Sequence, residues 1–265
     1  MPEDIDLFYA FRLKPEAAIK YFQAKGYVLT WNWTDLWREA HTKAFTVAKV
    51  ARMDVLQDIK GMIQKSLDEG IPLQIFQKEL TPMLQAKGWW GKVAVAGENG
   101  VEIAQLGSPQ RLKTIYQTNL QSAYMEGRRQ AFEANADDRP YWQYVAVLDA
   151  RTRPDHAALN GKVFRYDDPF WDEFFPPWDY NCRCRVRALD QGNLQERGLS
   201  VEDSSGSLST ENRTIIKTGE VRPVTVYTDP VTGKKSMPGI GWESNPGQDW
   251  QPDLGKYDQE IAALY

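Results

Sequence analysis

The sequence predicts an α+β protein in which a mainly helical N-terminal region precedes a compact α+β unit with short antiparallel strands. Apolar residues recur at helical spacing before Arg139-Pro140, whereas aromatic and β-branched residues become dense after it. At 265 residues the chain is long enough for two cores. We therefore expect four parts: a helical region at 1–139, the α+β unit at 140–190, a linker or mobile loop at 191–219, and a hairpin with an extension at 220–265.

Composition indicates a folded chain and excludes several classes of protein. The formal net charge of -4 excludes a wholly basic protein that coats nucleic acid, and an apolar fraction of 42% is enough for a core. No run of ~18 apolar residues is present, and the acidic start does not resemble a signal peptide. We therefore expect no membrane span and folding in a cytoplasm. Cys182 and Cys184 are one residue apart, which excludes a disulfide framework.

Helical spacing predicts the first elements. The pattern PEAAIKYFQAKG is typical of a short helix, with Gly26 as its stop. Thr34 is a suitable N-cap for a second helix, because apolar residues recur every three or four positions from there to Gly70. The pattern predicts one long amphipathic helix with an apolar face made of Leu36, Ala40, Ala44, Val47, Ala51, Val55, Ile59, Met62 and Ile63.

Two pairs of cap and proline residues predict further helix starts. Thr81-Pro82 has the form of an N-cap followed by proline at the first helical position, and Gly88 closes that segment. The turn residues GENG then separate two short apolar runs, which predicts a small hairpin or an irregular loop. Ser108-Pro109 starts a second strong helix, whose apolar face carries Leu112, Ile115, Tyr116, Leu120, Ala123, Tyr124 and Ala131.

Strand candidates lie in the second half of the chain. YWQYVAVLD is rich in aromatic and β-branched residues, and KVF, RCRVRAL and VRPVTVY add further extended segments. Residues 191–219 are polar and poor in large apolar side chains, which predicts the linker or mobile loop. VTVYTDPVTGKKSM predicts a hairpin that precedes a Trp-rich extension.

Unusual chemistry is concentrated in two short blocks, LDARTRPDHAALNGKVF and FFPPWDYNCRCRVRALD. If the second block is a strand, its side chains alternate between two faces, so Cys182 and Cys184 share one face. Together with His156 they supply three of the roughly four ligands that a closed zinc site needs. A carboxylate is available as the fourth ligand from Asp149, Asp155 or Asp179.

A metal-free interpretation of these residues is also open. Both cysteines then act as small buried hydrophobes, and His156 hydrogen-bonds to a local carboxylate or carbonyl. We expect no cofactor, with zinc as the one ion that these residues suit. A zinc deaminase is excluded, because its H-x-E and P-C-x-x-C patterns are absent. A Cys–His nucleophile pair is geometrically possible, but no segment suggests an oxyanion hole, so we expect no enzyme.

Five arginines lie in or beside these blocks and have two possible kinds of partner. They can contact DNA phosphates or carboxylates of a partner protein, because guanidinium is a planar bidentate donor. They can equally pair within the fold with neighbouring acidic residues such as Asp149. The candidate contact residues are Arg151, Arg153, Arg183, Arg185 and Arg187.

The segments VAVLDARTRPDHAALNGKVF and PPWDYNCRCRVRAL resemble the signature of the phage Mu F-type head morphogenesis family. The likeness spans residues 8–190. It implies a minor head protein of the virion that is incorporated near the portal, with roles in assembly, genome packaging or delivery. Its implied partners are the portal protein, other capsid or scaffold proteins and packaged double-stranded DNA, with no membrane. Assembly would take place in the host cytoplasm.

The chain departs from that family at the cysteine-rich positions. Many relatives carry C-x-x-C in the first block and H-P-N-C-x-C in the second, a pattern that resembles a zinc site. Here Arg153 stands where the first cysteine would be, His156 where the second would be, and Tyr180 in place of the histidine. Only His156, Cys182 and Cys184 remain as conditional ligands. The alternatives to a head protein are a nuclease or thiol hydrolase that uses His156, and a zinc-stabilised DNA-binding module.

Overall fold

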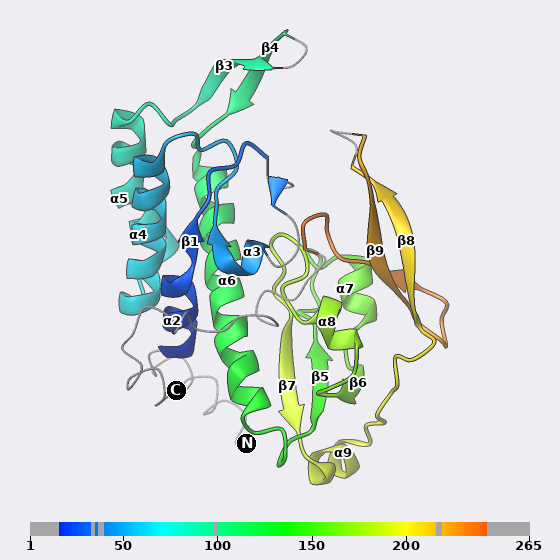
Figure 1. Cartoon of the computed structure of the whole chain (residues 1–265). Coiled ribbons are helices and arrows are strands. Elements are labelled where there is room, and N and C mark those ends of the chain that lie inside the picture. The colour runs from blue at the N-terminus through cyan, green and yellow to red at the C-terminus, as the bar shows by residue number, and fades with distance from the viewer. Residues whose placement is uncertain (1–15, 33–34, 37–39, 98–99, 216–218, 243–265) are drawn as a thin grey trace, which may run out of the picture.

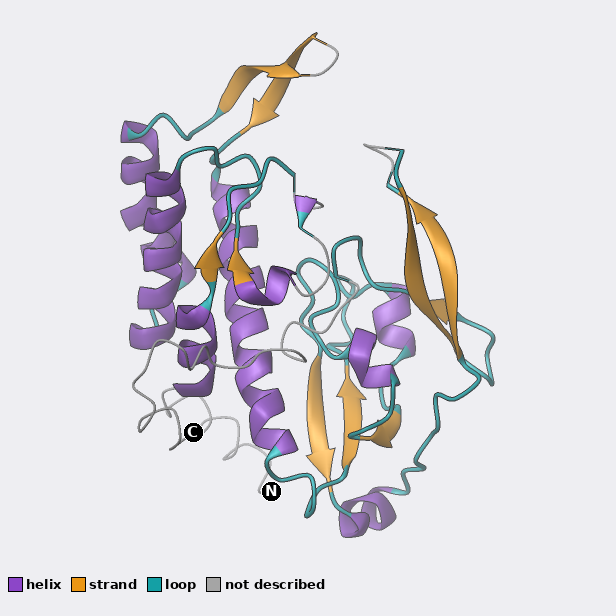
Figure 2. Cartoon of the chain, viewed as in Figure 1, coloured by secondary structure: helices purple, strands orange, loops and turns teal. Residues whose placement is uncertain are grey.

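The computed structural model describes residues 16–32, 35–36, 40–97, 100–215 and 219–242. It confirms the α+β class: helices pack together in the N-terminal part, and short antiparallel sheets follow. Figures 1 and 2 show the helices on one side of the molecule and the later sheets on the other, with the longest helix between them. No helix within the described ranges has the length and apolar character to cross a membrane.

The described N-terminal part is built mainly from helices α2 (Glu16–Ala24), α4 (Met53–Glu69), α5 (Leu73–Ala86) and α6 (Pro109–Glu133). They bury one apolar cluster that includes Phe22, Leu56, Phe76 and Leu112. The predicted start of α6 is confirmed, because the Ser108 side chain accepts a hydrogen bond from the Arg111 amide at 3.2 Å and Pro109 occupies the first turn.

The prediction of one long helix from Thr34 to Gly70 is wrong. Thr34 itself lies outside the described residues, and α4 begins only at Met53. Between them lie α3 (Ala40–Lys43) and β2 (Ala44–Phe45), which pairs in parallel with β1 (Gly26–Tyr27). Of the predicted apolar face in this stretch, Val47 is buried whereas Ala51 is exposed, and Phe45 and Val50 enter the core instead from extended and turn backbone. Lys49 has a positive φ of 63°, which a continuous helix does not allow.

The helix start predicted at Thr81-Pro82 is also wrong. Pro82 lies inside α5, which begins directly after Pro72. Pro82 is exposed, whereas Phe76, Leu80 and Leu84 on the opposite face are fully buried. Burial of these three side chains holds the helix together through a proline that costs about 3 kcal/mol in a helix interior.

The predicted hairpin is confirmed. Strand β3 (Lys92–Gly97) pairs antiparallel with β4 (Gly100–Gln105), from Lys92 opposite Gln105 to Gly97 opposite Gly100. Figure 1 shows that it projects from the end of the helices. No other strand pairs with it among the described elements, so both of its edges are available.

The predicted α+β unit is a three-stranded antiparallel sheet with two short helices. Central strand β5 (Tyr141–Val145) lies between β6 (Val163–Arg165) and β7 (Arg185–Leu189). Helices α7 (Pro154–Ala158) and α8 (Phe170–Phe174) cover it. An aromatic cluster fills the space between them and includes Trp142, Phe164, Phe170, Trp171, Phe174, Phe175 and Trp178.

The prediction that residues 191–219 form a linker or mobile loop is wrong for the two elements found there. Helix α9 (Gln191–Arg197) is closed by a capping box between Asp190 and Asn193, which compensates for its few apolar residues. Strand β8 (Leu208–Thr214) pairs along its length with β9 (Val221–Thr228). Polar side chains therefore occupy regular elements here, because backbone hydrogen bonds and caps stabilise them.

The C-terminal hairpin is confirmed as β9 and β10 (Lys235–Ser236), and the extension from 243 onward lies outside the described residues. The partly buried ammonium of Lys162 joins this hairpin to the α+β unit. Lys162 Nζ lies 2.6 Å from Asp229 Oδ2 and donates to Glu202 Oε2 at 2.7 Å. The division into four domains stays a prediction. The two ion pairs of Lys162 connect three of the predicted parts, 140–190, 191–219 and 220–265.

Substitution of Gly127 tests how closely α2 and α6 approach each other. A Cβ at Gly127 would lie 2.8 Å from the Ala18 backbone nitrogen, whereas a Cβ at Gly61 in α4 would meet nothing within 4 Å. We expect Gly127→Ala to lower the free energy of unfolding by about 1–2 kcal/mol despite its better helix propensity. The matched control Gly61→Ala should raise it by about 1 kcal/mol. Urea unfolding of both variants measures the difference, and stabilisation by both would contradict the packing described.

Candidate functional site

The two chemically unusual blocks meet where α7 packs beside the C-x-C turn that precedes β7. Arg153 occupies the N-cap of α7, and Pro154 fills its first turn, so His156 projects inward and is 2% exposed. On the other block, Asn181 adopts a left-handed backbone with φ of 56°, which turns the chain before Cys182. Both cysteine side chains are buried as free thiols.

The structure brings the three predicted metal ligands together. His156 Nδ1 lies 3.6 Å from Cys182 Sγ and 3.6 Å from Cys184 Sγ. The three donor atoms all lie within 4.8 Å of one another. We call these residues the Cys–His cluster.

Aromatic groups enclose the Cys–His cluster. The Trp178 indole stacks on the His156 imidazole with ring centroids 3.5 Å apart and an interplanar angle of 9°. Trp178 Nε1 donates to the buried Tyr144 hydroxyl at 2.9 Å. Tyr144 and Trp178 were not among the predicted site residues, and the aromatic richness of both segments was the only signal for them.

The two thiols shift each other's pKa in opposite directions. The hydrogen bond with Cys182 lowers the pKa of the Cys184 thiol, and the neighbouring His156 and Tyr144 side chains act in the same direction. The same hydrogen bond raises the pKa of the Cys182 thiol, as does its burial. Burial also raises the pKa of Tyr144. The pair therefore favours one thiolate over two.

Arg153 forms the outer wall of the Cys–His cluster. One guanidinium nitrogen lies 3.3 Å from His156 Nε2. The other donates to the Tyr180 carbonyl at 2.7 Å and lies 3.3 Å from Asp179 Oδ2. This arginine thereby joins the first block to the second.

None of the three carboxylates predicted as a fourth ligand joins the cluster. Asp149 accepts two hydrogen bonds from Arg183, Asp155 Oδ1 accepts one from the His156 amide, and Asp179 pairs with Arg153. Within the described ranges no further histidine, cysteine, aspartate or glutamate belongs to the group. A closed four-ligand zinc site therefore does not fit these residues.

The arginines alternate with the cysteines as predicted. Cys182 and Cys184 are buried, whereas Arg183, Arg185 and Arg187 are partly exposed, although β7 begins only at Arg185. Arg183 makes a bidentate pair with Asp149, with nitrogen–oxygen distances of 2.8 and 2.5 Å. Arg151 also reaches Asp149, at 3.4 Å. Arg151, Arg153 and Arg183 thus have acidic partners within the fold, and contact of the five arginines with DNA or a partner stays a prediction.

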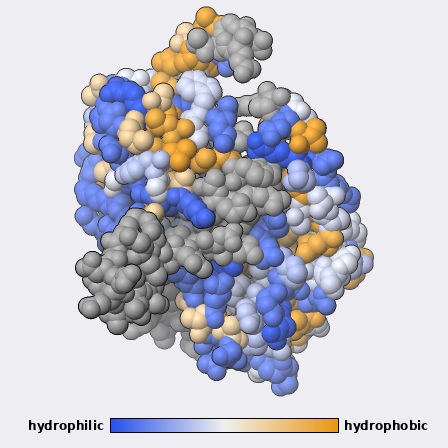
Figure 3. Space-filling view, viewed as in Figure 1, coloured by the Kyte–Doolittle hydropathy of each residue, from blue (hydrophilic) through white to orange (hydrophobic). Residues whose placement is uncertain are grey.

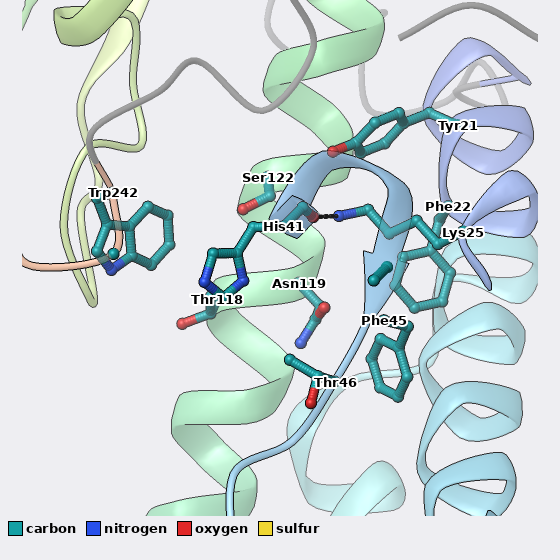
Figure 4. Close-up of a pocket in the computed structure, with 12 residues that line it drawn as sticks. Tyr21, Phe22, Lys25, His41, Phe45, Thr46, Thr118, Asn119, Ser122 and Trp242 are labelled. Carbon is teal, nitrogen blue, oxygen red and sulfur yellow. Dashed lines mark hydrogen bonds between the residues drawn. The ribbon is translucent and has the colours of Figure 1, made fainter. Parts of the chain in front are cut away.

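Two cavities in the described part of the chain are lined by no residue of the Cys–His cluster. One of about 50 Å³ is lined by residues of α2, α6 and the β2 segment, and Lys25 Nζ donates to the His41 carbonyl beside it at 2.7 Å (Figure 4). Another of about 230 Å³ lies along α6 and includes Tyr180. Both are smaller than the roughly 300–1,000 Å³ of typical small-molecule sites.

With this geometry in place, comparison with known proteins defines the class of protein. The family model described as Phage Mu protein F like protein matches residues 57–187, a range that contains the whole Cys–His cluster. The chain is therefore similar to the Mu F-like family over this range, which confirms the resemblance found in the sequence. No solved structure matches it.

Two curated relatives extend this likeness beyond the family model. The chain is 46% identical over 252 residues to the putative capsid assembly protein F of Escherichia phage Mu, which covers 93% of this chain and 57% of that protein. It is 42% identical over 222 residues to the Mu-like prophage FluMu F protein of Haemophilus influenzae, covering 83% of this chain and 53% of the relative. The chain thus spans about half the length of these relatives.

The Asp149–Arg183 pair should make stability depend on acid pH. The hydrogen bond from Arg183 holds the pKa of the Asp149 carboxyl well below its usual range. A lowered pKa means that the pair contributes stability above pH ~4 and loses it as pH falls below that value. We expect Asp149→Asn to flatten the decline of the free energy of unfolding between about pH 4 and 2. Urea unfolding of the wild type, Asp149→Asn, Arg183→Gln and the double variant gives the coupling energy between Asp149 and Arg183 at each pH. A coupling energy that stays the same from about pH 4 to 2 would contradict the prediction.

Proposed function

We propose that this protein is a structural component in the assembly of a Mu-like phage or prophage head. It docks with other head proteins and catalyses no reaction. The observation that supports the proposal best is the 46% identity to a putative capsid assembly protein that continues along 93% of the chain. Likeness over nearly the whole chain favours a shared role over reuse of one small module.

The chemistry of the Cys–His cluster supports assembly over catalysis. His156 and Cys184 are each 2% exposed and Cys182 is 6% exposed, so a substrate cannot reach either sulfur without rearrangement. A nucleophilic cysteine needs an accessible thiolate beside its base. The two cavities described are also small, and neither is lined by a residue of the Cys–His cluster, so they give the nuclease and thiol hydrolase alternatives no support.

The projecting hairpin is suited to docking. Val101 and Ile103 on β4 are 77% and 68% exposed, and Figure 3 shows apolar surface on the hairpin at the top of the view. The other face of the hairpin is anchored, because Ala104 is buried in the helical core and Val93 and Val95 pack against it. A partner that packs on the exposed face would therefore bury apolar surface on a strand pair that is already held in place. Free strand edges allow a partner strand to add to the hairpin.

We further propose that the protein is incorporated into the virion near the portal, after assembly in the host cytoplasm. Its partners would be the portal protein and other capsid or scaffold proteins, with a role in genome packaging or delivery. The net charge of -4 suits a protein beside packaged DNA, because it limits unspecific adhesion and leaves contact to local arginines.

Paired substitutions test the docking role of the hairpin. We expect Val101→Lys with Ile103→Lys to reduce co-purification with portal protein at least about tenfold, since charge in an apolar interface costs more than 1.4 kcal/mol. Val231→Lys, at a site 88% exposed in the β9–β10 turn, is the control and should bind normally. Infectious particles assembled normally without this protein would contradict the assembly role itself.

The arginine contact with DNA has a separate test. Arg185→Ala with Arg187→Ala avoids Arg183, whose pairing with Asp149 would complicate the result. If both arginines contact phosphates, the slope of log affinity against log salt should fall by about 2. Filter retention of double-stranded DNA from low to high salt measures the slope. If the double variant retains as much DNA as the wild type at every salt concentration, the two arginines do not contact DNA.

A further inference from the structure

We propose that the Cys–His cluster functions without a metal ion, and that the Arg153 guanidinium takes the place a metal would have in joining the two blocks. The inference concerns this chain's own residues and does not depend on the proposed function.

Distances alone are compatible with zinc. Zinc lies about 2.3 Å from sulfur and about 2.0 Å from imidazole nitrogen, so a tetrahedral site places nitrogen and sulfur roughly 3.6 Å apart. Both nitrogen–sulfur distances in the cluster are 3.6 Å. What decides between metal and no metal is therefore the proton on the histidine and the missing fourth ligand.

Arg153 determines which nitrogen of His156 carries that proton. A guanidinium has five N–H donors and no acceptor. Its nitrogen lies 3.3 Å from Nε2, and a donor at that distance requires Nε2 to present a lone pair. The neutral imidazole then carries its proton on Nδ1, the atom that faces both sulfurs.

This tautomer is the wrong one for a metal at the sulfurs. A metal bound to Nδ1 needs the lone pair there and leaves the proton on Nε2, where ligating histidines usually donate to a carboxylate or carbonyl. Here Nε2 would meet the N–H of Arg153 instead of an acceptor. With the proton on Nδ1, the imidazole can donate directly to a sulfur.

The position of Arg153 is itself fixed by the second block. The Tyr180 carbonyl and the Asp179 carboxylate both hold the guanidinium, at 2.7 and 3.3 Å. Arg153 thus links the N-cap of α7 to the chain that leads into the cysteines. Joining distant segments is the role of a structural zinc in small units, and here an organic cation performs it.

Three variants of Arg153 test the proposal by zinc content of the purified full chain after incubation with zinc chloride and gel filtration. Wild type and Arg153→Lys, which keeps a cationic donor, should retain little zinc. Arg153→Gln offers an acceptor for Nε2–H and should bind zinc about 10- to 100-fold more tightly than wild type. Arg153→Cys adds a third sulfur and should retain one equivalent. One equivalent of zinc on the wild type would overturn the proposal.

A second measurement needs no variant in the cluster. The chain has 2 histidines, so His41→Gln assigns the imidazole signals of His156 in a nitrogen-15 spectrum. We expect His156 to be the Nδ1–H tautomer, and EDTA to leave both this spectrum and the thermal midpoint unchanged. A proton on Nε2, or a fall in the midpoint with EDTA, would contradict a metal-free cluster even if the Arg153 variants fail to fold.

Discussion

Packing of α7 against the C-x-C turn buries the His156 imidazole, whose polar nitrogens must therefore find hydrogen-bond partners within the protein. His156 is enclosed by an indole on one face and two sulfurs at its edge, and an imidazole buried without partners costs several kcal/mol. Arg153 supplies the missing partner at Nε2 and is itself neutralised by Asp179. The positions of α7, the cysteine turn and the start of β7 all depend on this chain of contacts.

Local sequence signals predicted the elements that depend on interactions between residues close in the sequence, such as helix caps and tight turns. Ser108-Pro109 started α6, and alternating apolar residues around a glycine turn produced the β3–β4 hairpin. The failures occurred where tertiary packing overrides local preference. Val47 has helical spacing from the apolar residues that follow it, yet it reaches the core from non-helical backbone. Pro82 is tolerated because the opposite face of α5 is buried. Strand β8 is polar, so only its partner β9 reveals it.

The sequence predicted which residues form the candidate site, but it did not predict their hydrogen-bond and ion-pair partners. A C-x-C pair and one histidine in adjoining blocks sufficed to place three donors together. Sequence spacing could not show that Asp149 faces Arg183, or that Asp179 faces Arg153, because each pair joins residues from different blocks. Which imidazole nitrogen faces the sulfurs depends on the rotamer of a buried side chain, and no pattern in the sequence encodes it directly.

The Lys162 ion pairs constrain how the chain can be divided. The Lys162 ammonium pairs with Glu202 and with Asp229, and the second of these partners is present only with the last hairpin. A shortened version that stops at about 215 would remove Asp229 and the Tyr227 ring that lies against this ammonium, and would keep Glu202 as a partner of Lys162. The polar stretch that invites a cut is thus a poor place for a domain boundary, and expression trials should keep it joined to both sides.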